Sequence, residues 1–214
     1  MSRSNKLPFA QGKTAFGSEA TSVDNLTRSQ QLVGQTTYLP DIDSTGDKKS
    51  RRSNADVVAV IVRNVEPNVD GSTTLAAGDA VQWVTGYHGS RVEKADAGAN
   101  AQVAGFVDEH SSGVKTNDLF YMVVKGPSLV NVKDGGIHGD TGGFGGGASA
   151  NYYKEGFFAV LSSVSGAVEG DITSAGDGSA ATGIASTVGR FKQNAYIDVA
   201  NNATLKALLE VAIV

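Results

Sequence analysis

The stretch from Leu75 to Val132 decides the fold of this chain. It begins Leu75-Ala-Ala-Gly-Asp-Ala-Val-Gln-Trp-Val84, continues through Asp118-Leu-Phe-Tyr-Met-Val-Val-Lys-Gly126, and closes with Leu129-Val-Asn-Val132. Short apolar runs alternate with Gly, Asp and Asn at intervals of about ten residues. This spacing is typical of short strands in a barrel or a sandwich, so we expect an all-β fold with a small antiparallel barrel or sandwich as its body.

Within this stretch the pattern predicts strand boundaries and faces. Arg91–Lys94 is short and charged, which suits an exposed edge strand. In Val103–Val107, positions 103, 105 and 107 are expected on one face, with Ala104 and Phe106 on the other. We expect Gly126-Pro127 to end the strand over Leu119–Val124, and Leu129–Val132 to form a separate one.

Further strands are predicted on both sides of it. Val57–Val62 is a continuous β-branched run, as in a strand buried on both faces. The later candidates are Phe157–Leu161, Thr182–Phe191, Ala195–Val199 and Ala207–Val214. A short helix over Thr204–Leu209 is an alternative, but the Val-Ala-Ile-Val ending favours a final strand.

Composition permits a core and excludes several kinds of site. Of 214 residues, 40% are apolar, enough for a sizeable core. There is no cysteine, which removes disulfides, thiolate metal sites and cysteine nucleophiles. The formal charge of −4 is too small to favour nucleic acid as the main partner. With no secretory signal and no run near the ~20 apolar residues of a membrane span, we expect a soluble protein made in the cytoplasm.

The first 54 residues differ from the rest. They carry eight Lys and Arg against five Asp and Glu, whereas the remainder carries ten against seventeen. A polar, basic stretch with scattered apolar residues buries too little surface to fold alone. We therefore divide the chain into an extended, mostly irregular N-terminal arm, residues 1–54, and a barrel domain, residues 55–214. The arm is either a disordered tail or a segment that orders against a partner, with a short helix over Ser22–Val33 as a weaker possibility.

Two segments have compositions that are also found in binding sites for nucleic acids or nucleotides. Lys48-Lys-Ser-Arg-Arg52 places four cations in five residues, but no aromatic residue interleaves with them. This favours a solvated linker or a patch that docks on an acidic protein face. Residues 134–150 are rich in glycine without the Gly-Lys-Ser/Thr of a phosphate loop. We interpret them as a long loop inserted in the barrel.

No catalytic constellation is recognisable, so we expect neither an enzyme, a cofactor nor a metal. His88, His110 and His138 lie in separate Gly- and Ser-rich turns, where exposed histidines are expected, and no pair has metal-ligand spacing. Asp108 and Glu109 are adjacent, which directs them to opposite faces of a strand. The turn aspartates can accept backbone N–H bonds locally; they are Asp79, Asp96, Asp118, Asp171 and Asp177.

Taken in their order along the chain, the sequence motifs resemble those of a known protein family. The series is Ala77-Gly78-Asp79-x-Val81, Val92-x-Lys94-Ala95, Val103-Ala-Gly105-Phe-Val107 and Asp118-x-Phe120-x-x-Val123-Val-Lys-Gly126, closed by Ala181–Phe191 and Leu208–Ile213. In this order it resembles the small β-barrel decoration (cement) proteins of tailed-bacteriophage capsids, over residues 57–132 and 180–214. The long arm and the Gly-rich insert depart from that pattern.

The resemblance implies a non-enzymatic structural protein of the virion, made in the host cytoplasm. Its family forms trimers on the outer capsid surface and stabilises the shell. The implied partners are the major capsid protein, further copies in a homotrimer, and adjacent cement subunits, without nucleic acid or membrane. Our candidate contacts lie in the arm: Phe9, Phe16, Leu26, Tyr38 and Leu39 as apolar anchors, and Lys48, Lys49, Arg51 and Arg52 as charged contacts.

Three other functions stay open at this point. A glycan- or host-binding module displayed on a virion would use Trp83, Tyr87 or Tyr152-Tyr153, although core packing is the first expectation for Trp83. A β-barrel hydrolase lacks recognisable catalytic residues. A major shell subunit is disfavoured because the sequence contains no long periodic helix.

Overall fold

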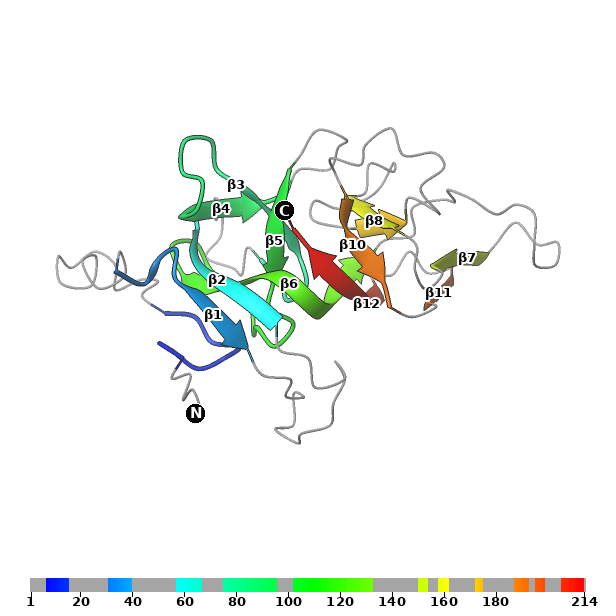
Figure 1. Cartoon of the computed structure of the whole chain (residues 1–214), viewed down its shortest axis with the longest axis horizontal. Coiled ribbons are helices and arrows are strands. Elements are labelled where there is room, and N and C mark those ends of the chain that lie inside the picture. Colours follow the sequence, from blue (N-terminus) through cyan, green and yellow to red (C-terminus); the bar gives the residue numbers. More distant parts are fainter. Residues whose placement is uncertain are drawn as a thin grey trace.

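The computed structural model describes residues 7–15, 31–39, 57–66, 75–95, 102–132, 150–153, 158–161, 172–174, 187–192, 195–198 and 205–213. Every named element in these ranges is a strand, so the predicted all-β class is confirmed (Figure 1). The strands are β1 (Thr36–Leu39), β2 (Val57–Asn64), β3 (Ala80–Trp83), β4 (Arg91–Lys94), β5 (Val103–Val107), β6 (Leu119–Val132), β7 (Ala150–Tyr153), β8 (Phe158–Leu161), β9 (Ile172–Ser174), β10 (Thr187–Phe191), β11 (Ala195–Asp198) and β12 (Leu205–Ala212).

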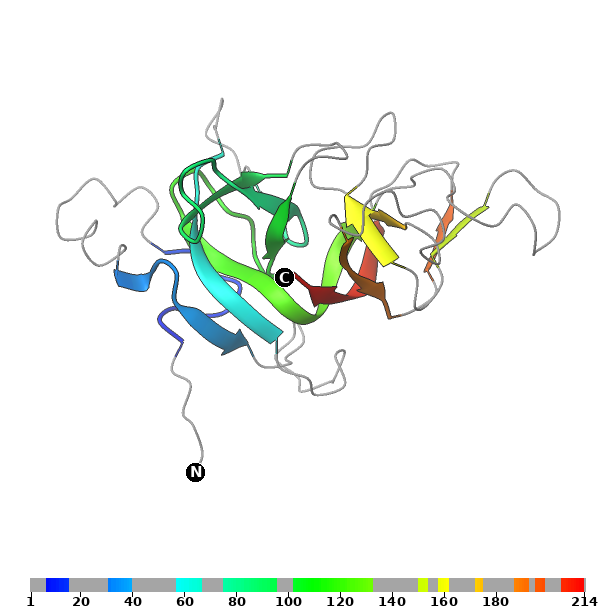
Figure 2. The ribbon, with the colours of Figure 1, turned by 45° about the horizontal axis from the view of Figure 1, so that its top comes forward.

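Five strands close into a barrel. They pair in the order β2-β4-β3-β5-β6, and β6 pairs back with β2 (Figure 2). The β2–β4 contact is parallel, with Arg63 opposite Arg91 and Asn64 opposite Val92, while the other contacts of the ring are antiparallel. A closed ring leaves no free edge among its own strands.

Strand β6 runs through both halves of the sheet. Its first half pairs with β2 and β5, and its second half pairs with β12 from Lys125 opposite Ala212 to Val132 opposite Leu205. The expected break at Gly126-Pro127 is therefore wrong. Proline lacks an N–H donor but is tolerated where a strand does not need that bond, and Pro127 lies close to where β6 exchanges β2 for β12.

The remaining strands extend the sheet away from the barrel. Strands β10, β8 and β9 follow β12, and β9 touches β6 in parallel through Val132 and Ile172. Strands β7 and β11 form a separate two-stranded sheet at the opposite end of the molecule from β1 (Figure 1). The C-terminal segment is a strand, as its Val-Ala-Ile-Val ending predicted.

Two detailed expectations within the barrel are wrong. Strand β4 is not an edge, because β3 and β2 pair with its two sides and Val92 is fully buried. The strict alternation of β5 is interrupted by an irregular register, in which Val81 faces Gly105 and Gln82 faces Val103. Such a bulge gives one strand an extra residue and turns the following side chains.

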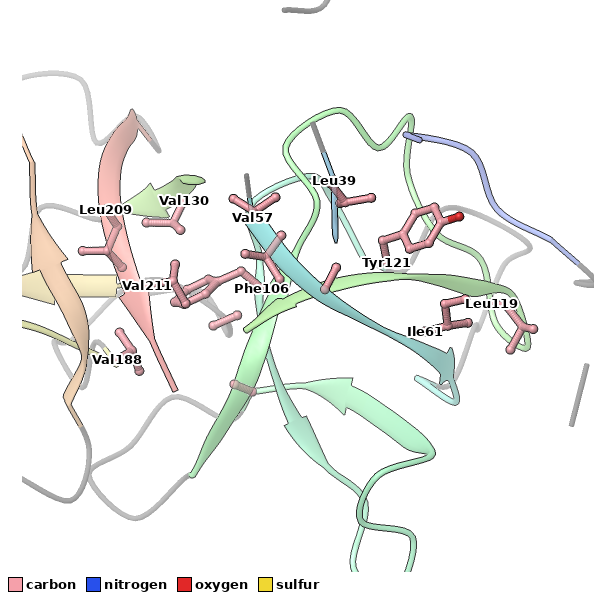
Figure 3. Packing of buried hydrophobic residues seen from close by; sticks show 14 residues of the cluster. Leu39, Val57, Ile61, Phe106, Leu119, Tyr121, Val130, Val188, Leu209 and Val211 are labelled. Atoms are coloured by element: carbon pink, nitrogen blue, oxygen red, sulfur yellow. The ribbon is translucent and has the colours of Figure 1, made fainter. Parts of the chain in front are cut away.

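Two apolar layers lie on opposite faces of β2 and β6. The barrel interior contains Val62, Phe120 and Met122, together with buried side chains from β3, β4 and β5. The neighbouring positions Ile61 and Tyr121 belong to the other layer, as expected when successive side chains of a strand point to opposite faces. This outer layer extends along β6 to β12 and Val188 (Figure 3).

Parts of the expected arm cover the outer layer. Strand β1 pairs with β2, and its Leu39 is fully buried there. Leu7, Phe9 and Ala15 pack against the same layer, as do Leu32 and Val33. The boundary expected at residue 54 therefore does not separate residues 7–15 and 31–39 from the barrel. The other residues of the arm, including most of the expected Ser22–Val33 helix, lie outside the described residues, as does the 134–150 loop.

Candidate partner-binding surface

The predicted arm contacts fall into three groups. Leu39 and Phe9 are engaged inside the molecule, so in this structure they anchor the chain to its own barrel. Tyr38 alternates with Leu39 along β1 and is 48% exposed, which leaves it available to a partner. The remaining candidates are outside the described residues: Phe16, Leu26, Lys48, Lys49, Arg51 and Arg52.

The segment of residues 7–15 is fixed to the barrel at both ends. The rings of Phe9 and Tyr121 stack with centroids 4.4 Å apart. The Tyr121 hydroxyl donates to the Phe9 carbonyl at 2.7 Å. Ala15 and Leu119 exchange two backbone hydrogen bonds of 3.0 and 2.9 Å. Aromatic stacking and paired backbone hydrogen bonds thus hold this segment against the barrel. The sequence did not reveal the contact, because Tyr121 is 112 residues from Phe9.

Replacing Tyr121 with phenylalanine should lower stability by about 1 kcal/mol at neutral pH, because the Phe9 carbonyl loses its donor. The pKa of Tyr121 is raised above the ordinary 10.0, mainly by burial; the Phe9 backbone N–H, which donates to the phenol oxygen at 3.4 Å, opposes this, and the charge of Asp108 adds to it. The folded phenol thus stays neutral where the unfolded one ionises. Its contribution is complete below about pH 10 and is lost as pH rises further.

Thermal midpoints between about pH 8 and pH 11 check this prediction. The wild type should lose stability more steeply at the alkaline end than Tyr121→Phe. The other tyrosines titrate in both proteins, so the difference between the two curves isolates Tyr121. Parallel curves would contradict the assignment.

Residues 108–110 form a buried polar cluster beneath this segment. Glu109 Oε2 accepts the Leu129 backbone N–H at 2.6 Å, and Glu109 Oε1 lies 3.4 Å from His110 Nε2. The His110 side chain is only 10% exposed, so the expectation of an exposed loop histidine is wrong for it. Gly12 lies against the backbone of His110. His88 is exposed as expected, and His138 lies outside the described residues.

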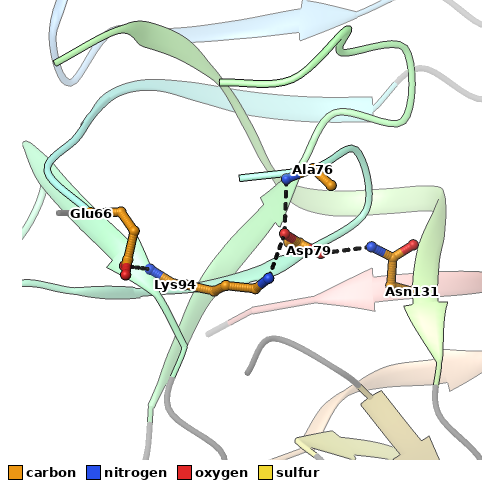
Figure 4. Close-up of polar contacts among 5 residues, drawn as sticks. All are labelled: Glu66, Ala76, Asp79, Lys94 and Asn131. Carbon is orange, nitrogen blue, oxygen red and sulfur yellow. Dashed lines mark hydrogen bonds and ion pairs between the residues drawn. The ribbon is translucent and has the colours of Figure 1, made fainter. Parts of the chain in front are cut away.

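The Ala77-Gly78-Asp79 motif forms a buried structural network (Figure 4). Asp79 is 4% exposed. Its Oδ2 accepts the Ala76 backbone N–H at 2.8 Å and lies 3.1 Å from Lys94 Nζ, while its Oδ1 accepts Asn131 Nδ2 at 2.6 Å. The network joins β3, β4 and the second half of β6. The local bond to Ala76 was predicted; Lys94 and Asn131 were not, because they come from distant strands.

Asp118 repeats the same turn. It accepts the backbone N–H of Lys115, three residues earlier, at 3.0 Å, and follows the left-handed Asn117 as Asp79 follows the left-handed Gly78. Asp79 and Asp118 each stand immediately before a strand. The prediction that these aspartates accept local backbone bonds is therefore confirmed for both, whereas Asp96, Asp171 and Asp177 lie outside the described residues.

The exposed aromatic surface is small. Among the described residues, the large exposed apolar side chains are Tyr38 at 48% and Tyr87 at 45%. Trp83 instead packs partly buried against the barrel interior, in line with the core role expected for it. Tyr87 lies in the β3–β4 turn, where the Arg91 guanidinium sits 4.1 Å from its ring centroid. The side chains of Tyr152 and Tyr153 are outside what the structure describes.

No protein-family model matches the chain, and no curated protein sequence matches it. In the described part of the chain, no group of three or more His, Asp or Glu side chains is arranged to hold a metal ion. A helix long and apolar enough to cross a bilayer is likewise not found among those residues. The fold defines the class of the protein as an all-β barrel with added strands.

Proposed function

We propose that this chain is a non-enzymatic decoration protein that binds the outer surface of a tailed-bacteriophage capsid and stabilises the shell as a homotrimer. The main support is the structural role of the motif residues. Asp79, Lys94 and Asp118 hold turns and strands of the barrel together. These contacts give the polar motif residues a structural role in building a rigid barrel. A rigid barrel is the kind of body that a decoration protein presents to its shell.

The covered outer layer changes which residues are candidates for docking. Removing the first 50 residues would delete Phe9 and Leu39 from the core, so a truncated chain would report loss of the fold together with loss of binding. Tyr38 and Tyr87 are the better candidates. Tyrosines in the centre of an interface often carry a large share of its binding energy.

Cosedimentation with capsids that lack a decoration protein tests the proposal. The wild type should pellet with the shells and saturate, and Tyr38→Ala should need about tenfold more protein to reach half-saturation. Tyr38→Ala should keep the urea midpoint of the wild type, because nearly half of this side chain is exposed. A folded wild-type protein that stays in the supernatant would refute the capsid role.

The exposed Tyr87 also favours a second candidate, a glycan- or host-binding module displayed on the virion. An exposed aromatic ring is a suitable platform for a sugar. Saturable binding on a glycan array that is lost in Tyr87→Ala would support this candidate. Binding that is unchanged in Tyr87→Ala would exclude this ring as the platform.

A further inference from the structure

Asp79, Lys94 and Asn131 form a connected triad in a site that is nearly closed to water (Figure 4). Asp79 lies between the other two, with its Oδ2 at 3.1 Å from Lys94 Nζ and its Oδ1 at 2.6 Å from Asn131 Nδ2. Asp79 and Asn131 are buried, and the Lys94 side chain is 19% exposed. One carboxylate thus holds a primary amine and a carboxamide against its two oxygens, away from bulk solvent.

Backbone contacts fix the positions from which the triad side chains extend. The Lys94 backbone N–H donates to Glu66 Oε2 at 2.8 Å, and the Asn131 backbone N–H donates to the Gly78 carbonyl at 2.9 Å. A Cβ added to Gly78 would lie 3.0 to 3.2 Å from three backbone atoms of β6, so a glycine here lets β6 approach the Asp79 turn closely. The fold therefore preorganises the triad.

We propose that Lys94 and Asn131 join in an intramolecular isopeptide bond, with Asp79 as the catalytic group that moves the protons. The residue types are those that the formation of an amide between side chains needs. Lysine supplies an amine nucleophile, asparagine supplies a carbonyl carbon with a nitrogen that can leave, and the carboxyl group contacts both as an acid and a base. This inference goes beyond the decoration role and does not depend on it.

The reaction balances without an external reagent. A proton first passes from Lys94 Nζ to Asp79 Oδ2, which converts the buried ion pair into a neutral amine and a carboxylic acid. The Nζ lone pair then forms a bond to Asn131 Cγ, and an electron pair of the carbonyl bond shifts to Oδ1. When the carbonyl re-forms, the Cγ–Nδ2 bond breaks; Asp79 gives its proton to the leaving nitrogen, takes one from Nζ, and loses that proton to the departing ammonia. The products are a secondary amide, one ammonium ion and the Asp79 carboxylate.

The arrangement of the triad lies close to the reactive one. Nζ must approach Cγ to about 3–3.5 Å, and the amine and the amide already contact the same carboxylate. Lysine has a flexible four-carbon stem, so rotation of the Lys94 side chain supplies this approach while both backbones stay in place. The low exposure of the site keeps water from competing with the amine for the carbonyl carbon.

The bond would connect two strands that do not pair with each other. Lys94 belongs to β4 and Asn131 to the second half of β6, and β3 and β5 lie between these strands in the ring. The second half of β6 also carries β12. The link would therefore tie the added strands covalently to the barrel and, as a disulfide does, restrict the unfolded chain.

Intact mass spectrometry of the purified whole chain, denatured before measurement, tests the inference. After correction for any removal of Met1, the wild type should weigh less than its sequence by one molecule of ammonia. A tryptic digest should contain residues 92–115, uncleaved after Lys94, joined to residues 126–133. Lys94→Arg and Asp79→Asn should each have the full mass of their own sequences, because one lacks the amine and the other lacks the proton carrier.

Lys192→Arg is the matched control. It makes the same replacement at Lys192, whose ion pair with Glu210 is exposed on both sides, and it should keep the loss of ammonia. Lys94→Arg leaves a cation beside Asp79, so it should remain folded, and its urea midpoint verifies this. The wild-type mass needs no variant at all, so the inference stays testable even where a substitution unfolds the chain.

Three results would overturn the inference. The first is a wild type with the full mass of its sequence. The second is a loss of ammonia that persists in Lys94→Arg, because it would come from cyclisation of another asparagine. The third is a loss of water in place of ammonia, which would mean that Lys94 is joined to a carboxylate and not to Asn131. A chain that carries the bond but does not pellet with capsids would refute the decoration role alone.

Discussion

Replacing Gly12 with alanine will loosen residues 7–15 from the barrel and lower stability by about 2–4 kcal/mol, because one substitution removes the fit of a whole segment. Gly12 has a φ of +73°, and an added Cβ would collide with the carbonyl group of His110. His110 lies in the turn after β5, and the side chain of its neighbour Glu109 fixes this turn by accepting the Leu129 backbone N–H. The stacked Phe9 ring and the Ala15–Leu119 bonds would be lost with the segment.

Gly86→Ala is the matched control for this prediction. Its φ of +84° imposes a similar backbone strain, but no atom lies within 4 Å of the added Cβ. It should therefore cost only about 1 kcal/mol. Urea unfolding gives the stabilities, and trypsin cleavage after the exposed Lys13 reports on the segment directly. Equal stabilities and equal cleavage rates in the two variants would show that residues 7–15 do not contribute to the fold.

Asp79→Ala should destabilise the protein by about 3–5 kcal/mol. The substitution leaves the Lys94 ammonium and the Asn131 amide without the carboxylate that both contact, in a site that is almost closed to water. The Ala76 N–H also loses its acceptor. Urea midpoints at neutral pH measure the loss, and Asp79→Asn should fall between the two proteins because its shape is kept.

Glu210→Ala provides the comparison. Glu210 pairs with Lys192 at 3.3 Å, but the two side chains are 42% and 49% exposed. Solvent screens such a pair, so its removal should change stability by less than about 0.5 kcal/mol. If Asp79→Ala and Glu210→Ala cost the same, the Asp79 network would not be the structural centre that its geometry indicates.

The sequence predicted local features well. Period-two patterns and β-branched runs identified β2, β3, β8 and β12, because these preferences operate within a few residues. The turn role of Asp79 and Asp118 followed from the same local chemistry. The pairing of the strands could not be predicted. The charges of Arg91–Lys94 suggested an edge strand, yet this strand pairs on both sides in the barrel, and Asp79 from outside the strand neutralises its Lys94.

The candidate site was harder to predict for the same reason. Phe9 and Leu39 were interpreted as anchors for a partner because nothing near them in sequence could bury them. Their burial comes from Tyr121 and β2, which only the folded chain brings into contact.

The decoration role is tested most directly by difference density between capsids imaged with and without the bound protein. We expect additional density on the outer surface of the shell, shaped as a group of three barrels and repeated at equivalent lattice positions. Density inside the shell, or no difference at a protein concentration that saturates cosedimentation, would contradict it.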